Sequence, residues 1–150
     1  MEEQSQVETL VVDASVIVKW YVMEEHREQA IKLRDDYIEG KLTLNAPSLM
    51  PYEVLNAIKQ AKKDISFETL ETVAESLTLY GIRLHELLGE LASLTVKIAV
   101  ENEVNVYDAA YIALAKLSDT MLYTCDEKLK ESLKNSYQRY VAHIKDYGHE

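Results

Sequence analysis

Four carboxylates stand where the chain is expected to change from strand or loop to helix, and each is embedded in apolar sequence. They are Asp13, Glu53, Asp108 and Asp126. Burying an ionised carboxylate without a partner costs on the order of several kcal/mol. Four such positions favour one shared compensation, and a divalent metal ion is the simplest.

Such an acidic cluster is suited to phosphodiester hydrolysis assisted by metal. Hard Mg²⁺ or Mn²⁺ prefers carboxylate oxygens and keeps several waters. One ion can turn water into hydroxide, and a second, about 3.5–4 Å away, can stabilise the leaving oxygen. Without metal the acids should repel one another, so at least one pKa should rise. The single cysteine, Cys125, excludes a multi-cysteine zinc site, and the histidines show no ligand spacing.

Each acid also has an ordinary structural interpretation. Glu53 and Asp108 would complement a helix dipole in a first turn. Asp13 would be a turn residue after a strand, and Asp126 would cap the following helix. The helix that carries Asp108 is apolar nearly all round, which indicates burial and disfavours a solvated cap. The convergence of all four positions favours the shared site.

The elements that must position these acids follow from the apolar pattern. Strands are expected at residues 9–12, 42–45, 82–85, 121–124 and 140–142. Helices are expected at 14–21, 24–39, 47–63, 66–79, from 87 to at least 98, at 105–117 and at 127–133. This alternation predicts an α/β domain with a mostly parallel sheet.

Ligands of parallel sheets bind outside the carboxyl ends of the strands. Asp13 directly follows the first expected strand and Asp126 follows the fourth, so both should lie on one rim. The helix starts that carry Glu53 and Asp108 should reach the same rim if their helices connect back from the opposite edge. The fold therefore predicts that the acids meet.

Composition sets the broader class. The chain has 150 residues, of which 47% are hydrophobic and 28% charged, and these values are typical of one globular domain. A net charge of −10 argues against broad electrostatic binding to nucleic acid, but not against a nucleic-acid enzyme. No apolar run approaches the about 20 residues that a membrane helix needs. The acidic start is not a secretory signal, so a cytoplasmic location is expected. We expect a flexible segment at 1–8, one domain at 9–145 and a loose polar tail at 146–150.

Four segments that contain the acids resemble the signature segments of PIN domains, and the VapC-type toxins in particular. They are Val11–Trp20, Pro51–Ile58, Tyr107–Ala115 and Thr124–Leu129. The resemblance extends from Thr9 to about Ala142, with the segments in the same order and spacing. One departure is Asn105, where many relatives carry Ser or Thr, although Asn caps a helix equally well.

This resemblance implies a three-layer α/β/α fold with a mostly parallel sheet of four or five strands. It also implies an endoribonuclease that depends on Mg²⁺ or Mn²⁺. Asp13 and Asp108 would be the principal metal ligands, Glu53 and Asp126 would complete the pocket partly through water, and Thr124 would support the site by hydrogen bonding. RNA would be the substrate, a small VapB-like antitoxin would inhibit the site with its tail, and the chain would form a homodimer.

Two other interpretations remain open, a housekeeping PIN nuclease of RNA processing or decay and a non-catalytic interaction module. Lys19, near Asp13, and Lys63, on the same expected helix face as Glu53, are weak candidates for contacts with RNA phosphate, against a solvated helix face. Tyrosines can stack on bases, but Tyr107 and Tyr111 lie at helical spacing and are expected to pack in the core.

Overall fold

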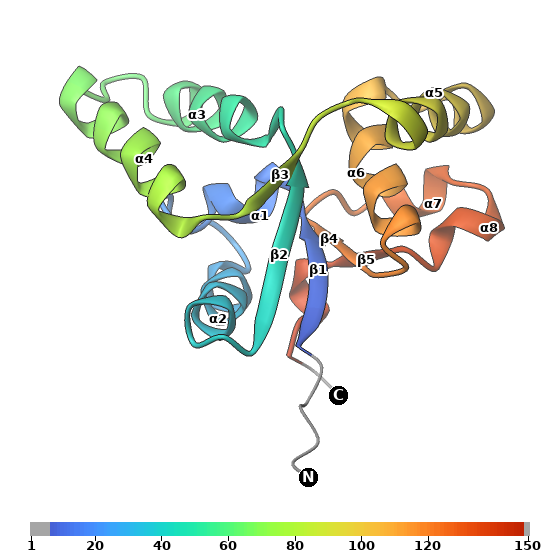
Figure 1. Ribbon diagram of the computed structural model, residues 1–150. Coiled ribbons are helices and arrows are strands. Elements are labelled where there is room, and N and C mark those ends of the chain that lie inside the picture. Colours follow the sequence, from blue (N-terminus) through green and yellow to red (C-terminus); the bar gives the residue numbers. More distant parts are fainter. Residues whose placement is uncertain (1–6, 149–150) are drawn as a thin grey trace, which may run out of the picture.

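A parallel five-stranded sheet forms the centre of the computed structural model, which describes residues 7–148 (Figure 1). The strands are β1 (Glu8–Val12), β2 (Leu42–Pro47), β3 (Arg83–His85), β4 (Leu122–Thr124) and β5 (Val141–His143). Their order in the sheet is β3-β2-β1-β4-β5, and every neighbouring pair is parallel. Val11 of the central strand is in register with Asn45 on one side and Leu122 on the other. The predicted α/β fold with a sheet of four or five strands is therefore confirmed.

Helices cover both faces of this sheet (Figure 1). They are α1 (Ala14–Val18), α2 (Arg27–Ile38), α3 (Met50–Ala61), α4 (Phe67–Tyr80), α5 (Gly89–Asn102), α6 (Val106–Leu117), α7 (Leu129–Ser132) and α8 (Asn135–Gln138). On one side α6 packs directly against β1, β2 and β4, and α5 packs on α6. On the other side α3 packs on α1 and α4 packs on α3.

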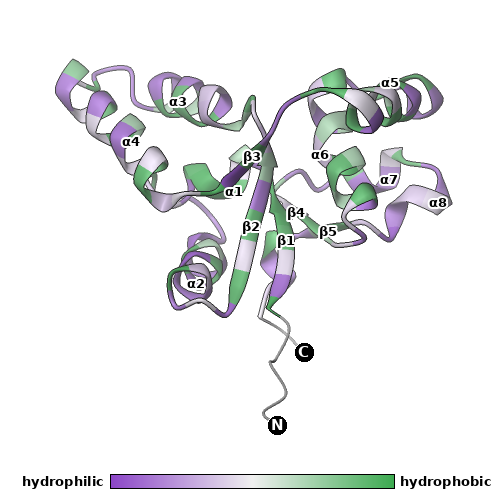
Figure 2. Cartoon of the chain, viewed as in Figure 1, coloured by the Kyte–Doolittle hydropathy of each residue, from purple (hydrophilic) through white to green (hydrophobic). Residues whose placement is uncertain are grey.

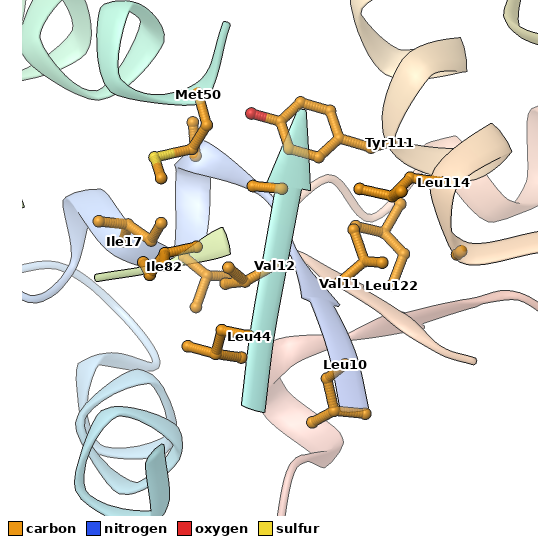
Figure 3. Packing of buried hydrophobic residues seen from close by; sticks show 14 of the residues in the cluster. Leu10, Val11, Val12, Ile17, Leu44, Met50, Ile82, Tyr111, Leu114 and Leu122 are labelled. Atoms are coloured by element: carbon orange, nitrogen blue, oxygen red, sulfur yellow. The ribbon is translucent and has the colours of Figure 1, made fainter. Parts of the chain in front are cut away.

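The core lies between these layers and is richest around β1 and α6. Leu10, Val11 and Val12 of β1 are almost completely buried, as Figure 3 shows together with Leu122 and Leu44 of the flanking strands. Each such side chain contributes roughly 1.5–3 kcal/mol by leaving water. Every residue from Ala109 to Ala115 of α6 is buried because this helix lies between the sheet and α5. Figure 2 shows the contrast between α1, which is coloured hydrophobic, and the hydrophilic loop between α3 and α4.

Local signals in the sequence fix several helix ends. Asn105 Oδ1 accepts a hydrogen bond from the backbone N–H of Asp108 at 2.7 Å and so caps α6, as predicted. Ser66 caps α4 in the same way, and such a cap contributes about 1 kcal/mol. Gly81 ends α4 with φ of 67°, in the left-handed region that glycine adopts without strain. These three boundaries agree with the sequence.

Other helix boundaries differ from those predicted from the sequence. The predicted helix at 14–21 is shorter, and the predicted helix at 47–63 begins at Met50 and ends at Ala61. The helix α8 was not expected, because four residues carry too little periodicity to reveal a helix. No helix within residues 7–148 is long and apolar enough to cross a membrane.

The two ends of the chain also depart from expectation. The predicted flexible segment at 1–8 lies mostly outside the described residues, but Glu8 begins β1. After β5 a short 3₁₀ helix, η1, spans Ile144–Asp146. Tyr147 then packs edge-on against Tyr123 and donates a hydrogen bond to Asp36 Oδ2 at 2.7 Å. The tail is thus held as far as Tyr147, because its aromatic ring finds a partner, and residues 149–150 lie outside the described part of the chain.

Candidate active site

The order of the strands defines where a ligand should bind. The connections run outward from β1 to β2 and β3, and then cross to β4 and β5, so the order reverses beside β1. In open α/β sheets the binding crevice lies at such a reversal, outside the carboxyl ends of the strands. Asp13 directly follows β1, and its backbone N–H donates to Tyr123 O of β4 at 3.0 Å. Asp126 follows β4 after one intervening residue. Both acids therefore lie at this reversal, on one rim.

Two hydroxyls hold the Asp13 carboxylate. Ser15 Oγ and Thr124 Oγ1 both donate to Asp13 Oδ2, at 2.6 and 2.8 Å. Each hydroxyl in turn accepts a backbone N–H from the loop after β4. Cys125 N donates to Ser15 Oγ and Asp126 N donates to Thr124 Oγ1, both at 3.1 Å. The network therefore ties the Asp13 carboxylate to the loop that carries Asp126.

The other two acids come from helix starts. Glu53 lies in the first turn of α3 and is half-buried. Its Oε1 accepts a hydrogen bond at 2.8 Å from the hydroxyl of Tyr111, which lies on α6. Asp108 lies in the first turn of α6, one turn before Tyr111. Glu53 and Asp108 are thus brought from opposite helical layers toward the same rim.

The charges of these acids act on one another. Burial raises the pKa of Asp13, and the charge of Asp126 raises it further. The hydrogen bonds from Ser15 and Thr124 lower this pKa, but they do not cancel the effect of burial. Burial also raises the pKa of Glu53, followed by the charges of Asp13 and Asp108. Burial, with Asp13 and Asp126 nearby, raises the pKa of Asp108 to about 6. The predicted rise in pKa is therefore present, and the structure brings Asp13 and Asp108 within electrostatic range of each other and of both Glu53 and Asp126.

The donor set fits a hard divalent ion. Among residues 7–148, no lysine, arginine or histidine forms an ion pair with any of the four acids. Burial raises the pKa of the Cys125 thiol to about 11, which disfavours a thiolate beside the rim in the metal-free protein. Carboxylate oxygens are what Mg²⁺ and Mn²⁺ prefer. Within the described chain, however, no three acidic, histidine or cysteine side chains converge closely enough to form a complete metal site.

The two lysines differ in position. Lys19 is 7% exposed, and its charge is close enough to Cys125 to lower the pKa of that thiol, so it lies beside the loop after β4. Lys63 was expected on the helix of Glu53, but α3 ends at Ala61 and Lys63 lies in the following loop. Glu53 and Ala61 are about 12 Å apart along the helix axis, at about 1.5 Å per residue. The predicted shared helix face of Lys63 and Glu53 is therefore wrong.

Of the two tyrosines that were expected to pack in the core, one is buried and the other is exposed. Tyr111 is buried, as predicted, whereas the prediction for Tyr107 is wrong because that side chain is 59% exposed at the start of α6. The contacts of Ser15 and Tyr111 with the acids were not predicted. The signal for Ser15 was its position two residues after Asp13, which suits a hydroxyl contact. The bond from Tyr111 joins residues 58 positions apart, and no local pattern reveals it.

The comparison with known sequences places these residues in one family. The family model for the PIN domain matches residues 10–132, which include all four acids. Ribonuclease VapC3 from Pyrobaculum aerophilum is 35% identical over 126 residues, which cover 81% of this chain and 92% of the relative.

Solved structures show the same fold. The crystal structure of PAE2754 from Pyrobaculum aerophilum matches with a TM-score of 0.59 at 23% identity, over 95% of this chain and 93% of that chain. The structure of FitAB bound to an IR36 DNA fragment matches with a TM-score of 0.61 at 14% identity, over 91% and 95%. These two likenesses concern the fold alone. The family model matches most of the chain and Ribonuclease VapC3 is 35% identical to it, so the chain belongs to the PIN-domain family, and within it resembles the VapC type.

Proposed function

We propose that this chain is a divalent-metal-dependent endoribonuclease and the toxin of a type II toxin–antitoxin pair. One observation carries the proposal: four carboxylates with no cationic partner among the described residues are held at the binding rim of a parallel sheet, and the pKa of Asp108 is raised to about 6. Asp13, Glu53 and Asp108 are partly buried and Asp126 is exposed, and a cation would offset the repulsion among such neighbouring carboxylates. The name of Ribonuclease VapC3 supports the same activity.

The residues have distinct roles in this proposal. Asp13 and Asp108 would hold Mg²⁺ or Mn²⁺, while Glu53 and Asp126 would contribute partly through water. The ion, when bound, would supply Lewis acidity that activates water and neutralises charge on the phosphate.

The surrounding residues prepare these ligands. Ser15 and Thr124 both donate to Oδ2 of Asp13, which fixes the carboxylate and leaves Oδ1 free of side-chain donors within residues 7–148. Hydrogen bonds from neighbours of this kind orient a ligand before the metal arrives. We further propose that Lys19, beside the loop after β4, attracts the RNA phosphate. Lys63 is not part of this proposal, because it lies beyond the far end of α3.

A toxin of this type would bind an antitoxin and a second copy of itself. We propose a small VapB-like antitoxin that inhibits the acidic rim, and a homodimer that acts in the cytoplasm, where its RNA substrate and antitoxin are. The likeness to Ribonuclease VapC3 supports this context. Growth arrest on expression of the chain alone, relieved by the product of a neighbouring small gene, distinguishes a toxin from a housekeeping nuclease.

The direct test is Asp13→Asn. Asparagine retains an oxygen that accepts from Ser15 and Thr124, so the variant should fold, as circular dichroism would show. Its cleavage of a single-stranded RNA in Mn²⁺ should fall by at least about 100-fold, because a metal-binding charge is lost. Asp64→Asn, at an exposed acid in the loop before α4, is the control and should cleave like the wild type. Full activity of Asp13→Asn would overturn the proposed function.

A further inference from the structure

Tyr111 makes a hydrogen bond that crosses the active-site rim. Its hydroxyl donates to Glu53 Oε1 at 2.8 Å, although its side chain is only 1% exposed. Figure 3 shows the ring beside α6, with its oxygen on the side of Met50 at the start of α3. Since α3 packs on α1 and α4 whereas α6 packs on α5 and the sheet, this bond links the helical layers of the two faces.

Glu53 needs such a restraint. A glutamate side chain has several rotatable bonds, and Asp13 and Asp108 lie close enough to repel its charge. Repulsion of this kind drives an unrestrained carboxylate outward to solvent. Within residues 7–148, the bond from Tyr111 is the one side-chain hydrogen bond that Glu53 accepts. It opposes the repulsion without adding a positive charge to the rim.

Tyr111 also shares a helix with a second acid. It lies three residues after Asp108 on α6, so the two side chains lie on neighbouring parts of one helix surface. The ring is enclosed in the core, so its hydroxyl has little freedom to move. Asp108 and the donor to Glu53 are thus carried by the same rigid segment.

We propose that Tyr111 is a positioning residue that orients the Glu53 carboxylate toward the rim by holding Oε1, and thereby leaves Oε2 available to the metal that the acids would hold. The proposal rests on the proposed function, because it concerns the same metal. The hydroxyl acts as a fixed hydrogen-bond donor in this role and exchanges no proton with RNA.

The test is Tyr111→Phe, which removes one oxygen and keeps the ring that fills the core. Calorimetric titration of the RNA-free protein with Mn²⁺ should show about 10- to 100-fold weaker binding, as is usual when a hydrogen bond to a metal-site group is lost. In RNA cleavage, kcat should fall while KM stays within about twofold, because Tyr111 is only 1% exposed and presents almost no surface for RNA to contact.

The chain offers a matched control. Tyr137 is also buried, 3% exposed, and its hydroxyl donates to Glu101 Oε2 at 3.0 Å away from the acids. Tyr137→Phe should bind Mn²⁺ like the wild type. If Tyr111 acts through Glu53, adding Tyr111→Phe to Glu53→Gln should weaken Mn²⁺ binding by no more than about twofold beyond Glu53→Gln alone.

If the wild type binds Mn²⁺ and cleaves RNA, either of two results would overturn the proposal for Tyr111. One is Mn²⁺ binding by Tyr111→Phe within about twofold of the wild type, and the other is losses from the two single variants that add in full. Absence of Mn²⁺ binding and cleavage in the wild type would instead overturn the proposed function itself.

Discussion

Replacement of Asp108 by asparagine should stabilise the metal-free protein near neutral pH. Burial and the charges of Asp13 and Asp126 raise the pKa of Asp108 from 3.8 to about 6. A carboxyl whose pKa is raised by folding favours the native state when protonated, so its contribution is complete below 3.8 and is lost as the pH rises through about 6. At about pH 7.5 the ionised Asp108 therefore opposes folding, and a neutral asparagine removes that opposition.

The size of the effect follows from the same numbers. A change from 3.8 to about 6 corresponds to about 3 kcal/mol, at about 1.36 kcal/mol per pH unit. Asp108 is only partly buried, so solvent screening reduces this to about 1–2 kcal/mol. For a chain of this length the increase in Tm at about pH 7.5 is then about 3–6 °C, with almost no change at about pH 4.

Thermal unfolding in EDTA at the two pH values measures this difference. Asp64→Asn, at an exposed acid, is the control and should leave Tm unchanged at both. In Mn²⁺ the wild type should have the higher Tm, because it gains stability from the bound ion whereas Asp108→Asn has lost a ligand. The reasoning fails if the variant is less stable than the wild type at the higher pH without metal, or if its effect is equal at both.

Two further predictions concern neighbours of the acids. Thr124→Val removes the donor to Asp13 and the acceptor for Asp126 N, so RNA cleavage should fall about 10- to 100-fold and urea unfolding should show a loss of about 1–3 kcal/mol. Its control is Thr95→Val, because Thr95 Oγ1 is buried with no hydrogen-bond partner in the described chain; equal damage from both would contradict the prediction. Lys19→Met should raise KM for RNA about 5- to 10-fold whereas Lys63→Ala should leave it within about twofold, and steady-state kinetics that show the opposite order would refute this assignment.

Much of the fold was predictable because its determinants are local. The short apolar run at 9–12 indicated a buried strand, and Asn105, Ser66 and Gly81 mark helix ends by chemistry that acts within a few residues. Once that strand was predicted, Asp13 could be placed directly after its last residue. Where such signals are absent the prediction failed: no glycine or proline marks the end of α3, so Lys63 was assigned to the helix.

The remaining features depend on contacts between distant segments. Tyr107 belongs to a helix that is apolar nearly all round, yet it lies in the first turn of α6, before the buried stretch that begins at Ala109, and is 59% exposed. The hydrogen bond from Tyr111 to Glu53 and that from Thr124 to Asp13 join residues 58 and 111 positions apart. Spacing and composition cannot reveal such pairs, because they exist only after the layers have packed.

The residues of the rim are spread along the chain from Asp13 to Asp126. The strand β4 carries Thr124 and pairs with β1, but it is synthesised long after β1. A partly made chain therefore has Asp13 and Glu53 but lacks the loop that fixes Asp13 and supplies the last acid. For a nuclease of the proposed kind, this order delays cleavage until translation of the domain is almost finished. The ribosome that makes the protein is thus not exposed to a working enzyme from its own nascent chain until β4 has emerged and joined the sheet.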